Sequence, residues 1–273
     1  MRTLVIHLGG IGDFLLSCPA LSGLRRCGPV DLLGKRERLE VAVDGGLADV
    51  AHDADACDLD TLFSTPSPRL QKFLAGYDRC VAWLRPDEVM LDAMCGCGVK
   101  QTHAYPGLPP AGWSRHASAY YLDCLDLEDP GPPRLSFQAS EVMPDLDVVI
   151  QPGSGGRQKN WPLDDYRVVA DELTGRGRQV AWCTGPAEEQ MQGLQPSLPP
   201  MSLARLGRTL ARARLYIGND SGITHLAAAS GCPTLAIFGP TNPTVWAPRG
   251  ANVRVIQGKE GFPTAEEVLS ASL

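Results

Sequence analysis

The sequence lacks long apolar runs, and this absence excludes membrane-spanning proteins. Its longest apolar stretches, such as VVI (148–150) and TLAIF (234–238), are far shorter than the ~20 residues that a transmembrane helix needs. The opening MRTLVIHLGG has one early Arg but too short an apolar segment, and no small-residue cleavage site follows, so we expect no signal peptide. The sequence therefore predicts a cytoplasmic protein with at most peripheral membrane contact.

The sequence also lacks an excess of positive charge and a regular cysteine pattern. It has 25 Lys and Arg against 31 Asp and Glu, a net charge of −6, and no polybasic run, so no nucleic-acid partner is expected. Its nine Cys are odd in number and scattered, which indicates free thiols rather than a disulfide framework. The close pair in CGCG (95–98) has no matching second pair, so we interpret it as a turn rather than a metal site.

What is present is an ordinary globular composition with alternating strand and helix patterns. At 273 residues the chain predicts two lobes of roughly 130 residues each. Apolar runs typical of buried strands alternate with segments of helical periodicity, which predicts parallel sheets. Pro19 falls inside the first helical segment and predicts a kink or a late start there. The cluster LEDPGPPRLSF (127–137) is typical of a linker, so we expect lobes at 1–140 and 141–273 with a cleft between them.

Three polar or glycine-rich turns follow predicted strands. The first is LGGIGDF (8–14), in which Gly10 and Gly12 allow a tight turn or a close approach to a ligand. Asp13 is suited to cap the following helix, or to act on a ligand. The glycine spacing is not that of a dinucleotide-binding fingerprint.

The second turn is QPGSGGRQKNWP (151–162), directly after the strand pattern LDVVI. Gly153 and Ser154 let the backbone approach an anion, and Arg157 and Lys159 can then reach it. A solvated loop with exposed cations explains the same residues equally well, so both interpretations stay open.

The third turn is IGNDSGITH (217–225), at a predicted strand-to-helix junction. The hydroxyls of Ser221 and Thr224 and the amides around Gly222 lie at a helix start, which favours a phosphate. Capping needs only one such residue, so four polar side chains in seven positions favour a ligand. His225 is the exception, because a lone His on a first turn is commonly a capping or core residue.

Together the three turns suit group transfer. Two phosphate-competent turns lie in the second lobe and one acidic turn lies in the first. One side would neutralise the leaving group, while a base on the other would take a proton from the nucleophile.

The blocks GDFLLSCPAL, QPGSGGRQKNWP and MSLARLGRTLARARLYIGNDSGITHLAAASGCPTLAIFGPTNP resemble glycosyltransferase family 9, which includes the ADP-heptose:lipopolysaccharide heptosyltransferases. The resemblance implies an α/β fold of GT-B architecture, with two Rossmann-like doubly wound lobes, whose last helix could pack back on the first lobe. It also implies an inverting, metal-independent transfer of a sugar, heptose or another, from a nucleotide diphosphate to an acceptor hydroxyl. An ADP-linked donor is favoured over a UDP-linked one, the acceptor is a glycan or glycolipid, and no cofactor is needed.

The resemblance assigns roles to particular residues. Asp13 would be the general base, and His225 would support the site at which Asp220 contacts the transferred sugar. On the donor side, Lys159, Ser221, Gly222 and Thr224 would bind the diphosphate, Asp220 the transferred sugar, Glu188 the ribose and Met201 the base; Gly10, Gly12, Gly153 and Ser154 would line the nearby loops.

The net charge of the first lobe bears on which kind of acceptor it would bind. Residues 1–140 hold 13 Lys and Arg against 18 Asp and Glu, a net of −5. A phosphorylated lipid core prefers a basic face, so this balance disfavours lipopolysaccharide as the acceptor. Two alternatives remain open, a nucleotide-sugar epimerase or hydrolase on the same scaffold and a non-catalytic nucleotide-sugar binding protein.

Overall fold

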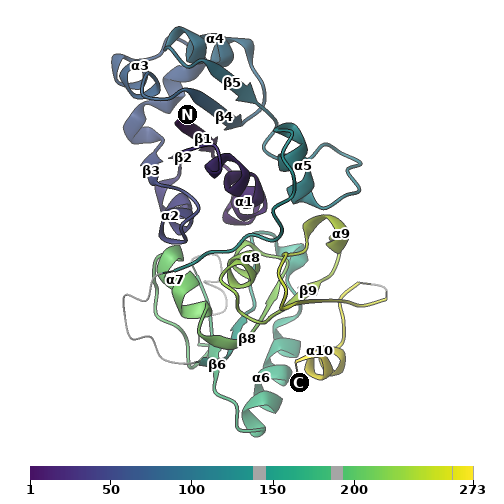
Figure 1. Ribbon diagram of the computed structural model, residues 1–273. Coiled ribbons are helices and arrows are strands. Elements are labelled where there is room, and N and C mark those ends of the chain that lie inside the picture. The colour runs from purple at the N-terminus through teal and green to yellow at the C-terminus, as the bar shows by residue number, and fades with distance from the viewer. Residues whose placement is uncertain (138–145, 186–192, 260, 273) are drawn as a thin grey trace. The chain divides into compact units, whose positions relative to one another are not determined.

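The computed structural model describes residues 1–137, 146–185, 193–259 and 261–272. The chain divides into two compact units, Met1–Gly131 and Pro132–Leu273. The boundary expected at 140/141 lies outside the described residues. Each unit is a parallel five-stranded sheet with helical connections (Figure 1).

Unit 1 has the strand order β3-β2-β1-β4-β5. The central strand β1 is fully buried because it pairs with β2 on one side and β4 on the other; Val5, for example, lies opposite Leu32 and Val81. Its elements are β1 (Thr3–His7), α1 (Ile11–Arg25), β2 (Val30–Gly34), α2 (Arg36–Asp44), β3 (Val50–Asp53), the 3₁₀ turns η1 (Asp55–Cys57) and η2 (Leu59–Phe63), α3 (Pro68–Leu74), β4 (Arg79–Trp83), α4 (Glu88–Gly96), β5 (Gln101–Ala104) and α5 (Ala117–Cys124).

The first helix corrects one expectation. Helix α1 begins at Ile11 and continues through Pro19 to Arg25, so the late start predicted from Pro19 is wrong. The apolar side chains of α1 are buried from Phe14 to Leu24, and this packing offsets the backbone hydrogen bond that a proline removes.

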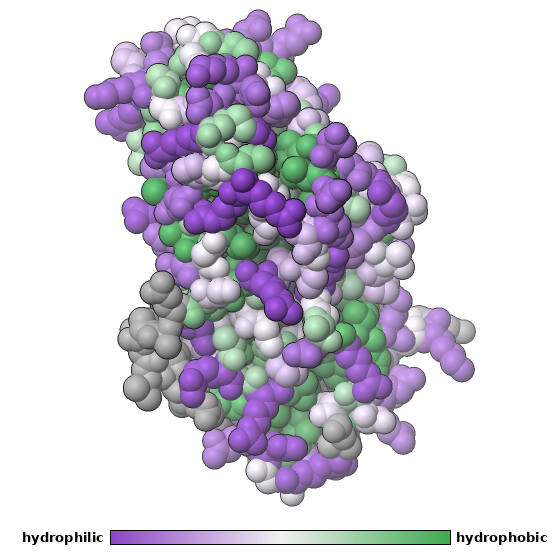
Figure 2. Space-filling view, viewed as in Figure 1, coloured by the Kyte–Doolittle hydropathy of each residue, from purple (hydrophilic) through white to green (hydrophobic). Residues whose placement is uncertain are grey.

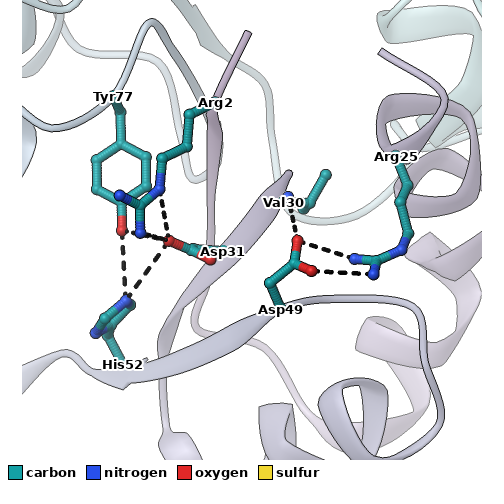
Figure 3. A network of polar contacts seen from close by, with 7 residues as sticks. All are labelled: Arg2, Arg25, Val30, Asp31, Asp49, His52 and Tyr77. Carbon is teal, nitrogen blue, oxygen red and sulfur yellow. Dashed lines mark hydrogen bonds and ion pairs between the residues drawn. The ribbon is translucent and has the colours of Figure 1, made fainter. Parts of the chain in front are cut away.

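A polar network joins the amino ends of the unit 1 strands (Figure 3). The buried carboxylate of Asp31 accepts hydrogen bonds from Arg2 at 2.6 and 3.1 Å and from the Tyr77 hydroxyl at 2.9 Å. Nearby, Asp49 accepts from the backbone of Val30 at 2.8 Å and pairs with Arg25 at 2.9 Å. These contacts fasten β1, β2 and β3 at the edge of the sheet opposite to their carboxyl ends.

Unit 2 has the order β10-β9-β8-β6-β7. The final helix packs against α6 within this unit, where Val268 joins the core that includes Tyr166 and Val169. Its elements are β6 (Leu146–Gln151), η3 (Arg157–Lys159), α6 (Leu163–Gly175), β7 (Val180–Trp182), α7 (Leu203–Leu210), β8 (Ala213–Asn219), α8 (Gly222–Ala229), β9 (Thr234–Phe238), α9 (Pro243–Trp246), β10 (Val253–Gln257) and α10 (Ala265–Ala271).

The surface and the thiols are unremarkable in distribution. Hydrophilic and hydrophobic residues are interspersed over the face shown in Figure 2. All nine cysteines are free thiols, as expected from the sequence. Within the described ranges, no helix combines the length and the apolar character that crossing a bilayer requires.

Candidate functional site

The residues of unit 2 that we predict to bind the nucleotide-sugar donor lie near the point at which the strand order of the sheet reverses. Strands β6 and β8 are neighbours, with Gln151 opposite Gly218, although the chain adds β7 beyond β6 and β9 beyond β8. The connections that leave β6 and β8 therefore diverge at their carboxyl ends and open a crevice, which is where open α/β sheets bind ligands.

The start of α8 presents backbone donors at this point. Ser221 is the N-cap, and its hydroxyl accepts the N–H of Thr224 at 3.3 Å. The N–H groups of Gly222 and Ile223 have no acceptor within the described part of the chain. First-turn donors and the helix dipole together favour an anion here.

Thr224 supports this turn from inside rather than facing the crevice. Its side chain is fully buried, and its hydroxyl lies 2.5 Å from the carbonyl oxygen of Asn219 and 3.1 Å from the hydroxyls of Ser221 and Tyr216. Ser221 also donates to Gln151 at 2.9 Å. The two predicted hydroxyls thus join α8 to β6 and β8, and the anion-binding capacity of this turn lies in its backbone.

Two predicted donor residues form an ion pair. Lys159 Nζ lies 2.8 Å from Asp220 Oδ2, with the Lys side chain 34% exposed and the Asp side chain 6% exposed. Burial of a carboxylate is costly unless a cation or hydrogen bonds compensate for lost hydration, and Lys159 supplies that compensation. The structure therefore brings together residues from loop 152–161 and from the β8–α8 junction.

Loop 152–161 is organised by internal hydrogen bonds. The Ser154 hydroxyl lies 2.7 Å from Asn160 Oδ1 and 2.8 Å from the carbonyl of Gly156. Gly153 is buried next to the end of β6. The short turn η3 lies in the second half of this loop, and its last residue is Lys159.

The remaining predicted donor residues are less closely tied to this group. His225 is buried in the first turn of α8. Met201 is partly exposed ahead of α7, and its sulfur lies 3.6 Å from the hydroxyl of Thr209. Glu188 lies outside the described residues.

In unit 1, Asp13 lies in the first turn of α1 at the carboxyl end of β1. Its Oδ2 accepts the N–H of Gly10, the N-cap residue, at 3.2 Å. The capping interpretation of Asp13 is thus realised, and the carboxylate is also partly exposed beside Gly12. This position is the switch point of unit 1, because β1 is flanked by β2 and β4.

His7 interacts with the backbone of Asp13, and the sequence did not identify it as part of this site. His7 ends β1, is buried, and accepts the N–H of Gly9 on Nδ1 at 3.2 Å. Burial lowers the pKa of His7 to about 4, although the backbone of Asp13 opposes this shift. Its place at the end of an apolar strand pattern was the available signal.

Cations approach the same edge of unit 1. Arg38 in α2 donates to the carbonyl of Gly9 at 2.9 Å. Lys35 directly follows β2, and Arg85 follows β4 two residues after Trp83; both are exposed. An acidic lobe thus carries basic side chains just beyond the carboxyl ends of the strands that flank β1.

A cavity of about 700 Å³ in unit 2 contains none of the predicted site residues. It lies by the amino end of β7, where Arg178, Gln179 and Val180 line it. We therefore place the candidate site on the residues at the carboxyl ends of β6 and β8, where polar groups converge.

Comparison with known families matches residues 127–270, more than half of the chain, to glycosyltransferase family 9 (heptosyltransferase). Lipopolysaccharide heptosyltransferase 1 of Pseudomonas aeruginosa is 34% identical over 151 residues, which are 49% of this chain and 42% of that protein. The aligned region thus spans less than half of this curated relative.

Solved structures resemble the chain over nearly its whole length. A family 9 glycosyl transferase from Veillonella parvula has a TM-score of 0.78 at 20% identity, covering 99% of this chain and 95% of that one. The Escherichia coli heptosyltransferase WaaC, solved with ADP, has a TM-score of 0.75 at 18% identity, with both chains fully covered. These likenesses confirm the predicted α/β fold of GT-B architecture with two Rossmann-like lobes.

Proposed function

Because the chain belongs to glycosyltransferase family 9, the heptosyltransferase family, we propose that it transfers a sugar from a nucleotide diphosphate donor to an acceptor hydroxyl. The single observation that carries this proposal is the convergence of Lys159, Asp220 and the start of α8 at the switch point of unit 2. All three lie within the residues that match the family.

On the donor side, Lys159 and the N–H groups of Gly222 and Ile223 would hold the diphosphate. They supply a cation and fixed dipoles to the charge that develops on the leaving group. This is the reason to propose a metal-independent reaction. Asp220 and His225 would serve the transferred sugar, with Glu188 and Met201 at the nucleoside and Gly153 and Ser154 in the adjoining loop.

On the acceptor side, Asp13 would be the general base, with Gly10 and Gly12 shaping its turn. A carboxylate takes the proton from the acceptor hydroxyl as its oxygen attacks the anomeric carbon. The bond from that carbon to the diphosphate oxygen breaks on the opposite face, so the configuration inverts. The proton ends on Asp13 and the electron pair on the nucleoside diphosphate.

ADP and a heptose are the nucleotide and sugar that we propose first. The structurally similar E. coli heptosyltransferase WaaC was solved with ADP. Relatives identified by sequence include lipopolysaccharide heptosyltransferases 1 and 3. The acceptor would be a glycan or glycolipid of lipopolysaccharide or surface glycan assembly. Lys35, Arg38 and Arg85 offer a local basic environment for acidic groups of such an acceptor, despite the acidic balance of the lobe. Cytoplasmic location and peripheral membrane contact belong to the same proposal.

Calorimetric titration with ADP and UDP tests the donor side before any acceptor is known. We expect ADP to bind more tightly than UDP. If the folded protein binds neither nucleotide, the proposal is wrong.

The variant Asp13→Asn tests the base. Asn keeps an oxygen that can accept the N–H of Gly10, so the turn is preserved while the basic group is lost. We expect transfer from ADP-heptose to fall by about 10²–10⁴-fold, with ADP affinity unchanged. Undiminished turnover would exclude Asp13 as the base, and rapid consumption of the donor without an acceptor would instead indicate an epimerase or hydrolase.

A further inference from the structure

Asn219 is a fully buried polar residue at the end of β8 for which the proposed transfer has no direct use. Its amide nitrogen donates to the carbonyl of Pro152 at 2.7 Å. Its amide oxygen accepts the backbone N–H of Trp161 and the hydroxyl of Tyr166, each at 2.9 Å. One side chain therefore makes three hydrogen bonds in a dry environment, where each bond is costly to lose.

Two of these bonds hold the two ends of one loop. Pro152 is the first residue after β6, and Trp161 is the second residue after Lys159. Between them lies the glycine-rich segment 153–160, which has few side chains of its own to pack. Ser154 and Asn160 tie its middle together, but Asn219 is the residue that fixes both ends to β8.

The next residue in the chain completes the arrangement. Asp220 Oδ2 lies 2.8 Å from Lys159 Nζ. Two adjacent residues thus contact the loop: Asn219 binds its backbone, and Asp220 pairs with the side chain of Lys159. The turn that ends in Lys159 is short, and its backbone bond from Lys159 N to the carbonyl of Gly156 is 2.8 Å. A shift of Trp161 would therefore move Lys159.

We propose that Asn219 is a positioning residue. By binding both ends of loop 152–161, it holds Lys159 at the start of α8. The inference rests on the proposed donor role of Lys159. Asn219 acts through the loop backbone and touches no substrate.

The test measures ADP affinity by calorimetry in the full chain. Asn219→Ala removes all three bonds, whereas Asn219→Asp keeps an oxygen for Trp161 and Tyr166 but replaces the donor to Pro152 with a second oxygen, which the Pro152 carbonyl repels. We expect each variant to weaken ADP binding by on the order of 10-fold, since a displaced contact group loses its interaction steeply with distance. Tyr166→Phe is the matched control: it removes a bond to the same side chain but leaves both loop ends held, and its ADP affinity should equal that of the wild type.

A second series separates positioning from general stability. In a Lys159→Met background, Asn219→Ala should weaken ADP binding no further, because the group that it positions is absent. Additive losses, or an equal loss in Tyr166→Phe, would show that Asn219 only supports the core. If the wild type binds ADP and Lys159→Met weakens it while the Asn219 variants do not, this inference fails and the proposed function stands. Failure of the wild type to bind ADP would defeat both.

A measurement on the unaltered protein covers the case in which the variants do not fold. The amide of Trp161 should exchange its hydrogen much more slowly than that of Gly155, which lies in the exposed middle of the loop. Equal exchange rates at the two amides would overturn the proposal.

Discussion

Lys159 Nζ lies 2.8 Å from the almost wholly buried Oδ2 of Asp220, so the cation that we propose for the diphosphate is paired with a carboxylate. The ammonium of Lys159 compensates the buried carboxylate for its lost hydration. A diphosphate that arrives at α8 must share or take over the ammonium. The two residues are therefore best tested with ligands that contain or lack the sugar.

Replacing Lys159 by Met should weaken ADP binding by about tenfold or more, because a charge-assisted contact is lost. Arg157→Met is the matched control. Arg157 belongs to the same short turn and is exposed, and its loss should change ADP affinity much less. Calorimetry on both variants decides the matter, and equal losses would mean that the loop acts only by its overall charge.

Replacing Asp220 by Asn should separate the sugar from the diphosphate. The neutral side chain no longer competes for Lys159, so ADP should bind as tightly as before or more tightly. The intact nucleotide sugar should bind more weakly, because contacts to the sugar hydroxyls are lost. Titration with ADP and with ADP-heptose measures both effects, and parallel losses for the two ligands would contradict a sugar-binding role for Asp220.

Gly218 is required by close packing. A Cβ there would lie 2.5 Å from the hydroxyl of Tyr216, which itself contacts Thr224 and Gln151. Gly218→Ala should lower the free energy of unfolding by about 1–3 kcal/mol, as overpacking of a core does. Gly155→Ala is the control, because nothing lies within 4 Å of its added Cβ. Urea denaturation should find the control close to the wild type; similar losses in both variants would exclude this explanation.

Burial of His7 should make stability depend on pH. Its pKa falls from 6.5 when unfolded to about 4 in the folded protein, so the unfolded chain binds the extra proton between these values. The stability that neutral His7 gives is complete above pH 6.5 and is lost as the pH falls toward about 4. His7→Asn removes the titration but keeps an acceptor for the N–H of Gly9.

The loss of unfolding free energy between pH 7 and about pH 4.5 should then be about 2 kcal/mol smaller in His7→Asn than in the wild type. Urea denaturation at the two pH values measures this difference. The pKa values of His52 and His103 are also lowered by burial, but both residues are present in each protein and cancel. An identical pH dependence in the two proteins would show that burial does not lower the pKa of His7.

Most strands that the sequence predicted are buried, and the exception is VRVIQ (253–257), which forms the partly exposed edge strand β10. β1, β2, β4, β8 and β9 are rich in apolar residues because neighbouring strands and helices cover them. β3 and β5 were missed, since each lies at the edge of its sheet and is partly exposed, with His and Asp or Gln in place of an apolar run. α4 was missed as well, although Asp87 caps it in the ordinary way.

The positions of the donor-site residues were predicted from the sequence pattern, while their contacts with one another were not. Lys159, Asp220 and Ser221 stand out as polar residues after apolar strands, and that pattern alone places them at the carboxyl edge of a sheet. Nothing in the sequence indicates that Lys159 pairs with Asp220, that the hydroxyl of Thr224 is used inside the protein, or that Asn219 binds both ends of loop 152–161.

The sequence by itself determined the alternation of strand and helix, the parallel sheets and the polar turns, because these depend on local periodicity and on residues at strand ends. Only the tertiary structure decided the strand order β10-β9-β8-β6-β7. That order makes β6 and β8 neighbours, and it thereby brings loop 152–161 to the start of α8. Contacts between residues so distant in the chain depend on which strands pair, and pairing is a property of the whole sheet.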